Sequence, residues 1–142
     1  MKKVTLRRLA VLVICVGLSS SNLAAGKKST KPASTVEAGY AAALACANRF
    51  LHAWQSADQE AGLLLLSDAA KHHTTQEGLD NFFASGAGAA YEIGRGKKLK
   101  AGQYSFPVVL FQLKVGNTAS RRLSQITVIR AGKDDWTVDR LP

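Results

Sequence analysis

Cysteine is nearly absent from this chain, which holds two cysteines among its 142 residues. Cys15 lies in a leader that we expect to be removed, so Cys46 would be the one thiol of the mature protein and no internal disulfide can form. Cys46 stands among alanines within a predicted helix, a setting that favours a buried and unreactive thiol. The fold must therefore rely on an apolar core, for which an apolar fraction of 46% is ample.

Acidic residues are scarce as well: 10 Asp and Glu stand against 19 Lys and Arg, which gives a formal net charge of +9. Subtracting the four basic residues of the leader, Lys2, Lys3, Arg7 and Arg8, from +9 leaves +5 for the mature chain. An excess of this size favours anionic surfaces without specifying a partner.

No apolar run is long enough to cross a bilayer as a resident helix, since the longest extends only from Leu9 to Leu18. Basic residues precede this run and small residues follow it, so residues 1–25 are predicted to be a secretory signal cleaved after Ala25. Leu23 is not the ideal residue three positions back, which leaves the cleavage site open. We expect export to the periplasm or the medium, with a retained membrane anchor as the alternative.

Residues 26–39 are predicted to be a disordered basic linker ahead of a single domain over residues 40–142. Lys27, Lys28 and Lys31 are its basic side chains. A tail of this kind can contact an anionic component of the cell envelope, and a solvated spacer is the plainer alternative.

Three helices are predicted next. The first carries one apolar stripe, the second has four consecutive leucines, and the third begins where Thr74 and Glu77 have capping-box spacing. Either Ser56 or Asp58 can cap the second helix. The expected bounds are roughly Val36–Ser56, Gln59–Leu66 and a third helix that ends at Ser85–Gly88.

About four strands follow, separated by turns that contain glycine. The expected strands are Ala89–Lys100, Gln103–Val115, Leu123–Arg130 and Asp135–Leu141. From Val108 onward both alternating sets of side chains are apolar, so this strand is expected to be covered on both faces. The pattern predicts an α+β fold, with three N-terminal helices packed on a curved, mainly antiparallel four-stranded sheet.

Two segments carry a resemblance to a known family: ANRFLHAWQSAD at 47–58 and DWTVDRLP at 135–142. They resemble the first helices and the last strand of the nuclear-transport-factor-2-like superfamily, which includes ketosteroid isomerase and polyketide cyclases. The resemblance covers Tyr40–Pro142. It implies a sheet wrapped around the first helix, a pocket at the open end of the resulting cone, and in many members a dimer through the outer sheet face.

Family enzymes place an acid–base residue inside the cone, but no such set matches this chain residue by residue, so no catalytic residue is assigned. Aromatic side chains are the candidate pocket lining, although aromatic residues at these spacings more often belong to an ordinary core. They are Tyr40, Trp54, Phe83, Tyr91, Phe106 and Trp136. Glu92, Arg130 and Asp139 are candidate polar groups, with ion pairing on the outer sheet face as the plainer use.

A second candidate site is a basic patch for an anionic partner, which forms if the hairpins align at one end of the sheet. Its residues are Arg95, Lys97, Lys98, Lys100, Arg121 and Arg122. A solvated rim is the alternative. We expect no nucleic-acid binding, because few aromatic residues are interleaved with the patch and the chain is predicted to be exported.

No metal ion or cofactor is expected. His72 and His73 are adjacent, so they do not share one helix face, and the ligand spacings of zinc sites are missing. The glycine-rich segments 86–88 and 94–97 lack the spacing of phosphate-binding loops and are interpreted as turns.

Three functions remain open. The first, which we favour, is an exported non-catalytic module that binds a small apolar ligand or a protein partner and self-associates through its sheet. The second is a small enzyme of the isomerase, cyclase or hydratase type. It requires at least one of four residues inside a concave apolar pocket: His52, His73, Glu92 or Asp139. The third is a structural protein held at the envelope by its basic linker.

Overall fold

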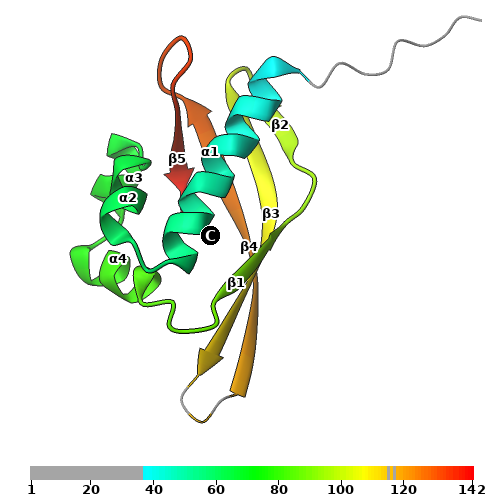
Figure 1. The fold of residues 1–142 in the computed structure, drawn as a ribbon. Coiled ribbons are helices and arrows are strands. Elements are labelled where there is room, and N and C mark those ends of the chain that lie inside the picture. Colours follow the sequence, from blue (N-terminus) through cyan, green and yellow to red (C-terminus); the bar gives the residue numbers. More distant parts are fainter. Residues whose placement is uncertain (1–36, 115, 117) are drawn as a thin grey trace, which may run out of the picture. The chain divides into compact units, whose positions relative to one another are not determined.

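The computed structural model describes residues 37–114, 116 and 118–142 (Figure 1). The predicted leader and the three lysines of the linker lie outside the described residues. Within the described part, helices come first and a curved antiparallel sheet follows, so the predicted α+β class is confirmed.

The helical part contains four helices, one more than predicted: α1 (Ala38–Gln55), α2 (Gln59–Leu64), α3 (Asp68–His73) and α4 (Gln76–Phe83). The additional helix is α3, which lies between the second and third predicted helices. Its start is set by Ser67, whose hydroxyl accepts a hydrogen bond from the backbone N–H of Ala70 at 3.0 Å. Ser67 therefore begins a helix at the point where we had expected one to end.

Two other helix starts also depend on side-chain caps. Asp58 caps α2 by accepting from the N–H of Ala61 at 3.0 Å, which selects one of the two predicted capping residues. Thr75, and not Thr74, caps α4 by accepting from the N–H of Gly78 at 3.0 Å. The predicted start of this helix was wrong by one residue, because Thr74 is used to end α3 in an extended conformation.

The sheet has five strands, where four were predicted: β1 (Ala90–Ile93), β2 (Lys97–Lys100), β3 (Gln103–Lys114), β4 (Thr118–Arg130) and β5 (Trp136–Arg140). The strand order is β1-β3-β4-β5, with β2 pairing to β3 beyond the end of β1. Pro107 occupies the break between β1 and β2, where β3 needs no backbone donor. The predicted strand over 89–100 is therefore two strands.

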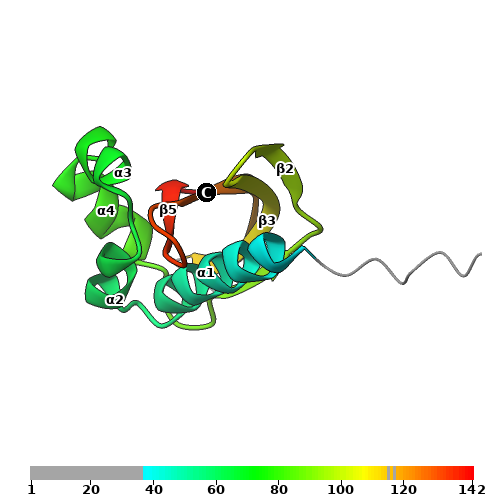
Figure 2. The same cartoon turned by 90° about the horizontal axis from the view of Figure 1, so that it is seen from above.

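Helix α1 lies across the concave face of the sheet, and α2, α3 and α4 gather beside β5 (Figures 1 and 2). Alanines on α1 allow close packing against the sheet, where the larger Phe50, Leu51 and Trp54 are buried. Cys46 is fully buried and donates its Sγ–H to the carbonyl oxygen of Trp136 at 3.1 Å. The predicted buried thiol is confirmed.

The two faces of the β3–β4 hairpin differ. On the concave face Phe106 pairs with Ile126, and both side chains are fully buried. On the outer face Val109 pairs with Leu123, whose side chain is 71% exposed. The strand was predicted to be covered on both faces, and that prediction is wrong for the chain by itself, because none of the described residues covers the outer face.

None of the helices in the described ranges is long and apolar enough to cross a membrane.

A candidate ligand-binding cleft between α3 and β5

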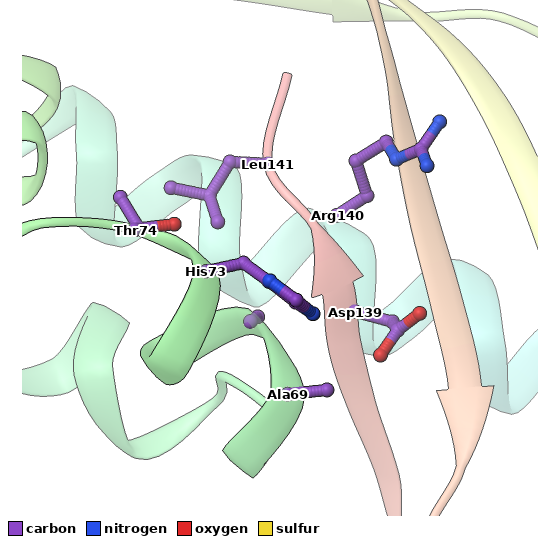
Figure 3. Close-up of a pocket in the computed structure, with 7 residues that line it drawn as sticks. Ala69, His73, Thr74, Asp139, Arg140 and Leu141 are labelled. Atoms are coloured by element: carbon purple, nitrogen blue, oxygen red, sulfur yellow. The ribbon is translucent and has the colours of Figure 1, made fainter.

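A cleft of about 510 Å³ opens between α3 and the end of β5 (Figure 3). This volume lies within the range of small-molecule sites in proteins. The lining residues are Ala69, Ala70, His73 and Thr74 from the helix and Asp139, Arg140 and Leu141 from the strand and its continuation. The cleft therefore combines small apolar surface with a few polar groups.

The polar groups of the cleft face one another across it. Figure 3 shows the imidazole of His73 directed toward the carboxylate of Asp139, while the side chain of Arg140 extends away past β5. One carboxylate oxygen of Asp139 accepts a hydrogen bond from the hydroxyl of Ser67 at 2.9 Å. This bond fixes the half-buried carboxylate at the edge of α3.

Asp139 lies at an irregularity in β5. Val138 pairs with Val128, but the next pair joins Arg140 to Thr127, so the strand contains a bulge in which Asp139 is the extra residue. Arg140 therefore takes the position opposite Thr127 that Asp139 would hold in a regular strand, and Asp139 lines the cleft beside α3.

A second cleft, of about 310 Å³, adjoins the first. It is lined by Thr74, Gly78, Asn81, Phe82, Arg122, Leu141 and Pro142. Thr74 and Leu141 line both clefts, so the two are continuous along the C-terminal end of β5.

The six aromatic residues predicted to line a pocket lie in or against the hydrophobic core. Four of them, Trp54, Phe83, Phe106 and Trp136, are at most 7% exposed, and the two tyrosines are half-buried. The ring centroids of Tyr40 and Phe106 are 5.5 Å apart, as in ordinary core packing. None of the six lines either of the two clefts described above. Their role as ligand contacts stays a prediction.

Both tyrosine hydroxyls of this set are engaged by the backbone. The hydroxyl of Tyr40 accepts from the N–H of Gly96 at 3.1 Å. The hydroxyl of Tyr91 donates to the carbonyl oxygen of Asn48 at 3.4 Å, and partial burial raises the pKa of this phenol above its ordinary value. The first contact joins the start of α1 to the turn between β1 and β2, and the second joins β1 to the middle of α1, so both roles are structural.

The six basic residues predicted to form one patch fall into two groups. Lys97 pairs with Ser105, whereas Arg121 pairs with Phe111, six residues further along β3. At the rise of an extended strand this separation is about 20 Å. Lys98 is already paired with Glu37 at 2.8 Å. Binding of an anionic partner by either group stays a prediction.

The four candidate acid–base residues differ in whether they line the first cleft. His52, His73 and Glu92 are exposed and Asp139 is half-buried, and of the four only His73 and Asp139 line the first cleft. Within the described ranges, no group of three or more His, Cys, Asp or Glu side chains is arranged to hold a metal ion. Ala69, Thr74 and Leu141 line the cleft but were not predicted as site residues. The capping signal of Ser67 and Asp68 would have predicted α3, which forms one wall of the cleft.

No protein-family model and no curated protein match this sequence. Solved structures do match. A ketosteroid isomerase-like protein from Erwinia carotovora atroseptica SCRI1043 has 18% identity and a TM-score of 0.55, over 73% of this chain and 93% of that one. A Mycobacterium tuberculosis protein in complex with estradiol-17β-hemisuccinate has 17% identity and a TM-score of 0.46, over 68% and 92%.

The Δ5-3-ketosteroid isomerase from a Mycobacterium species has 12% identity and a TM-score of 0.46, over 68% of this chain and 98% of that one. The first of these matches, at a TM-score of 0.55, shows that the chain shares the fold of a ketosteroid isomerase-like protein, which agrees with the resemblance noted in the sequence. Identities this low establish the fold alone, so function has to be argued from the site.

Proposed function

We propose that this protein is an exported binding module that takes a small, largely apolar ligand into the cleft between α3 and β5. The observation that carries the proposal is the cleft itself, about 510 Å³ in volume and lined by both apolar and polar side chains. Ala69, Ala70 and Leu141 supply the apolar surface, and Thr74, His73 and Asp139 supply groups that orient a ligand by hydrogen bonds.

The experiment is a titration of the mature protein, produced from the full chain, with decan-1-ol, followed by backbone amide chemical shifts. Decan-1-ol has an apolar body and one hydroxyl, which matches the lining. We expect the shifts to concentrate at residues 69–74 and 139–141. Shifts at Trp54, Tyr91 and Phe106 would instead place the ligand among the core aromatic residues, and the absence of saturable shifts would overturn the proposal.

Two substitutions make this test specific. Ala69 lines the cleft and is exposed, so Ala69→Trp fills the cleft without disturbing the core. Ala45 is exposed on α1 and lines neither cleft, so Ala45→Trp is the matched control. Only the first variant should lose decan-1-ol binding, by about tenfold or more.

A second candidate function is proton transfer by His73. The imidazole is directed toward the Asp139 carboxylate across the cleft, which places a base and a carboxylate at one site (Figure 3). We would measure deuterium exchange at the α-carbons of 2-decanone in D₂O. Exchange that is accelerated by the protein and lost in His73→Gln would favour catalysis, whereas unchanged exchange would leave binding as the function.

We also propose self-association through the outer sheet face. Val109 and Phe111 are half-buried there, and Leu113 and Leu123 are 45% and 71% exposed. Two charged residues flank this apolar surface. They are Glu92 on β1, which pairs with Val109, and Arg121 on β4, which pairs with Phe111. A second copy related by a two-fold axis can place each acid over the other copy's base, which makes the face self-complementary.

Export is proposed from residues 1–25 alone. The mass of the protein recovered after expression of the full chain tests it: cleavage after Ala25 leaves a chain that begins at Gly26. A chain that keeps residues 1–25 and stays with the membrane would favour the retained anchor.

A further inference from the structure

We propose that β2 and the turn before it form a docking surface for an anionic lipid bilayer. The inference goes beyond the proposed function, because neither of the two clefts is lined by a residue of β2. Figures 1 and 2 show β2 beside the start of α1, whereas α3 lies on the far side of β5. A protein docked through β2 would therefore keep the cleft between α3 and β5 open to its ligand.

The docking surface is a short strand in which every residue is exposed and three of the four are lysines. Lys97 pairs with Ser105 and Lys100 pairs with Gln103, with a register shift between the two pairs. Both lysines therefore lie on the outer face of the sheet. The shift leaves Leu99 as the extra residue of the strand, and it is 50% exposed. β2 thus presents an apolar side chain between two cations.

The positive charge of this surface exceeds the negative charge beside it. The ion pair within the described ranges joins Lys98 to Glu37 at 2.8 Å and so uses one lysine of β2 and the acid at the start of α1. Arg95, Lys97 and Lys100 remain, and all three are exposed. On the outer face, Glu92 belongs to a pair four residues further along β3, which is about 13 Å away.

The loop after β4 lies near the same end of the sheet, because the backbone N–H of Arg130 donates to the carbonyl oxygen of Gly102 at 2.8 Å. Arg130 and Lys133 supply two positive charges there, and Asp134 and Asp135 supply two negative ones. This loop therefore adds no net charge, and the excess of the surface comes from β2 and the turn before it.

A lipid bilayer matches both components of the surface. Lysine ammonium groups interact with phosphate headgroups as point charges. The exposed leucine between them gains free energy from burial only where an apolar layer lies beneath the charged one, as in a membrane interface. A nucleic-acid backbone or an acidic polymer offers the charge without the apolar layer.

The segment that precedes α1 adds charge at the same place. Residues 26–36 lead into Glu37 and contain Lys27, Lys28 and Lys31. Because Glu37 is paired with Lys98 on β2, this segment joins the domain beside the docking surface. Two basic segments attached at one point can contact one bilayer together, and linked contacts of this kind hold more tightly than either alone.

The experiment is cosedimentation of the mature protein with vesicles of phosphatidylglycerol and phosphatidylcholine in equal parts. We expect partition onto these vesicles at low salt, a decrease as salt is added, and no partition onto phosphatidylcholine alone. Lys97→Gln combined with Lys100→Gln should lower the partition coefficient about tenfold or more, because each lysine near an anionic surface contributes about a fivefold factor. Leu99→Gln should lower it by about fivefold.

Each variant has a matched control. Lys71→Glu lowers the net charge by two, as the double substitution does, but Lys71 is exposed on α3, away from β2 (Figure 1). Leu64→Gln is the control for Leu99→Gln, because Leu64 is 78% exposed on α2. Both controls should partition like the wild type. Equal losses in a variant and its control would assign binding to overall charge or hydrophobicity and would overturn the docking surface.

Three other results would also overturn it. Glutamine at Lys27, Lys28 and Lys31 could abolish partition while the double substitution on β2 has no effect, which would place the contact in the segment before α1 alone. Polyglutamate could bind and displace the vesicles in a manner that depends on Lys97 and Lys100, which would make the partner an acidic polymer. The protein could also fail to partition onto the anionic vesicles at low salt. Decan-1-ol binding is independent of all three results, so the proposed function is tested separately.

Discussion

The hydroxyl of Ser67 joins the start of α3 to the carboxylate of Asp139. It accepts from the backbone N–H of Ala70 at 3.0 Å and donates to Asp139 Oδ1 at 2.9 Å. The backbone N–H of Ser67 also donates to the carbonyl oxygen of Val138 at 2.9 Å. One residue therefore fixes both walls of the proposed ligand cleft relative to each other.

Substitution of Ser67 by alanine should affect both stability and ligand binding. Loss of the cap costs about 0.5–2 kcal/mol of stability, and loss of the second bond frees the Asp139 carboxylate. Thr75→Ala is the control, because Thr75 caps α4 and lines neither cleft. Urea unfolding should show similar losses for the two variants, whereas only Ser67→Ala should weaken decan-1-ol binding. Equal binding by both variants would contradict the coupling.

Gly62 on α2 should tolerate no side chain. A methyl group at this position would overlap the ring of Phe83, which is buried. Overpacking of this kind costs about 1–3 kcal/mol, more than the gain of about 1 kcal/mol that alanine brings to a helix. Gly62→Ala should therefore lower the free energy of unfolding.

Gly39 on α1 is the matched helical glycine. A methyl group there would approach the Tyr104 hydroxyl at 3.4 Å and the Trp136 ring at 3.5 Å, which are tolerable contacts. Gly39→Ala should leave the free energy of unfolding unchanged or raise it by up to about 1 kcal/mol. A loss as large as that of Gly62→Ala would show that the packing around α1 is tighter than the structure indicates.

The ion pair between Glu37 and Lys98 should make stability depend on pH. The hydrogen bond from Lys98 lowers the pKa of the Glu37 carboxyl below its ordinary value of 4.5. A lowered carboxyl pKa stabilises the fold above the ordinary value, and this contribution is lost as the pH falls through the folded-state pKa. Both side chains are exposed, so the effect is small and decreases with salt.

The measurement is urea unfolding of the wild type and Glu37→Gln at about pH 7 and about pH 3. The variant should be less stable near neutrality, and the two proteins should converge in acid. In a Lys98→Gln background, Glu37→Gln should have a smaller effect near neutrality, because the contribution of Lys98 is gone and only the hydrogen bond with Tyr104 remains to lower the carboxyl pKa. A difference in the free energy of unfolding that persists at the acidic pH would show that the substitution acts through some cause other than the loss of the carboxylate charge.

The fold was predictable because its signals are local and repeated. The apolar stripe of α1 and the alternation along β3 extend over many residues, so single irregularities do not obscure them. Helix α3 has only six residues, too few to show a helical period, and it was missed. A turn at 94–97 was expected, but β2 was not predicted as a separate strand, because its four residues are too few to show a period of their own.

The cleft was less predictable, for two physical reasons. Its walls come from α3 and from the end of β5, separated by more than sixty residues, and nothing in the sequence indicates that they meet. The bulge at Asp139 is also visible only in the pairing of β5 with β4, which the sequence does not show. The aromatic residues were chosen as pocket lining because spacing does not distinguish a core residue from a ligand contact. Trp54 and Phe106 turned out to be fully enclosed in the core.

Self-association through the outer sheet face predicts that Leu123→Lys weakens the dimer. Leu123 is 71% exposed at the centre of the apolar surface, opposite Val109. A lysine there would bring like charges together across a two-fold interface. We expect the dissociation constant measured by analytical ultracentrifugation to rise about tenfold or more.

Leu64→Lys is the control for this experiment. Leu64 is 78% exposed on α2, away from the sheet face, so the same change of charge and hydrophobicity occurs outside the proposed interface. The control should dimerise like the wild type. A wild type that remains monomeric at its highest soluble concentration would contradict the interface. Equal weakening by both substitutions would attribute the effect to net charge instead of the sheet, because the two variants differ only in where the lysine stands.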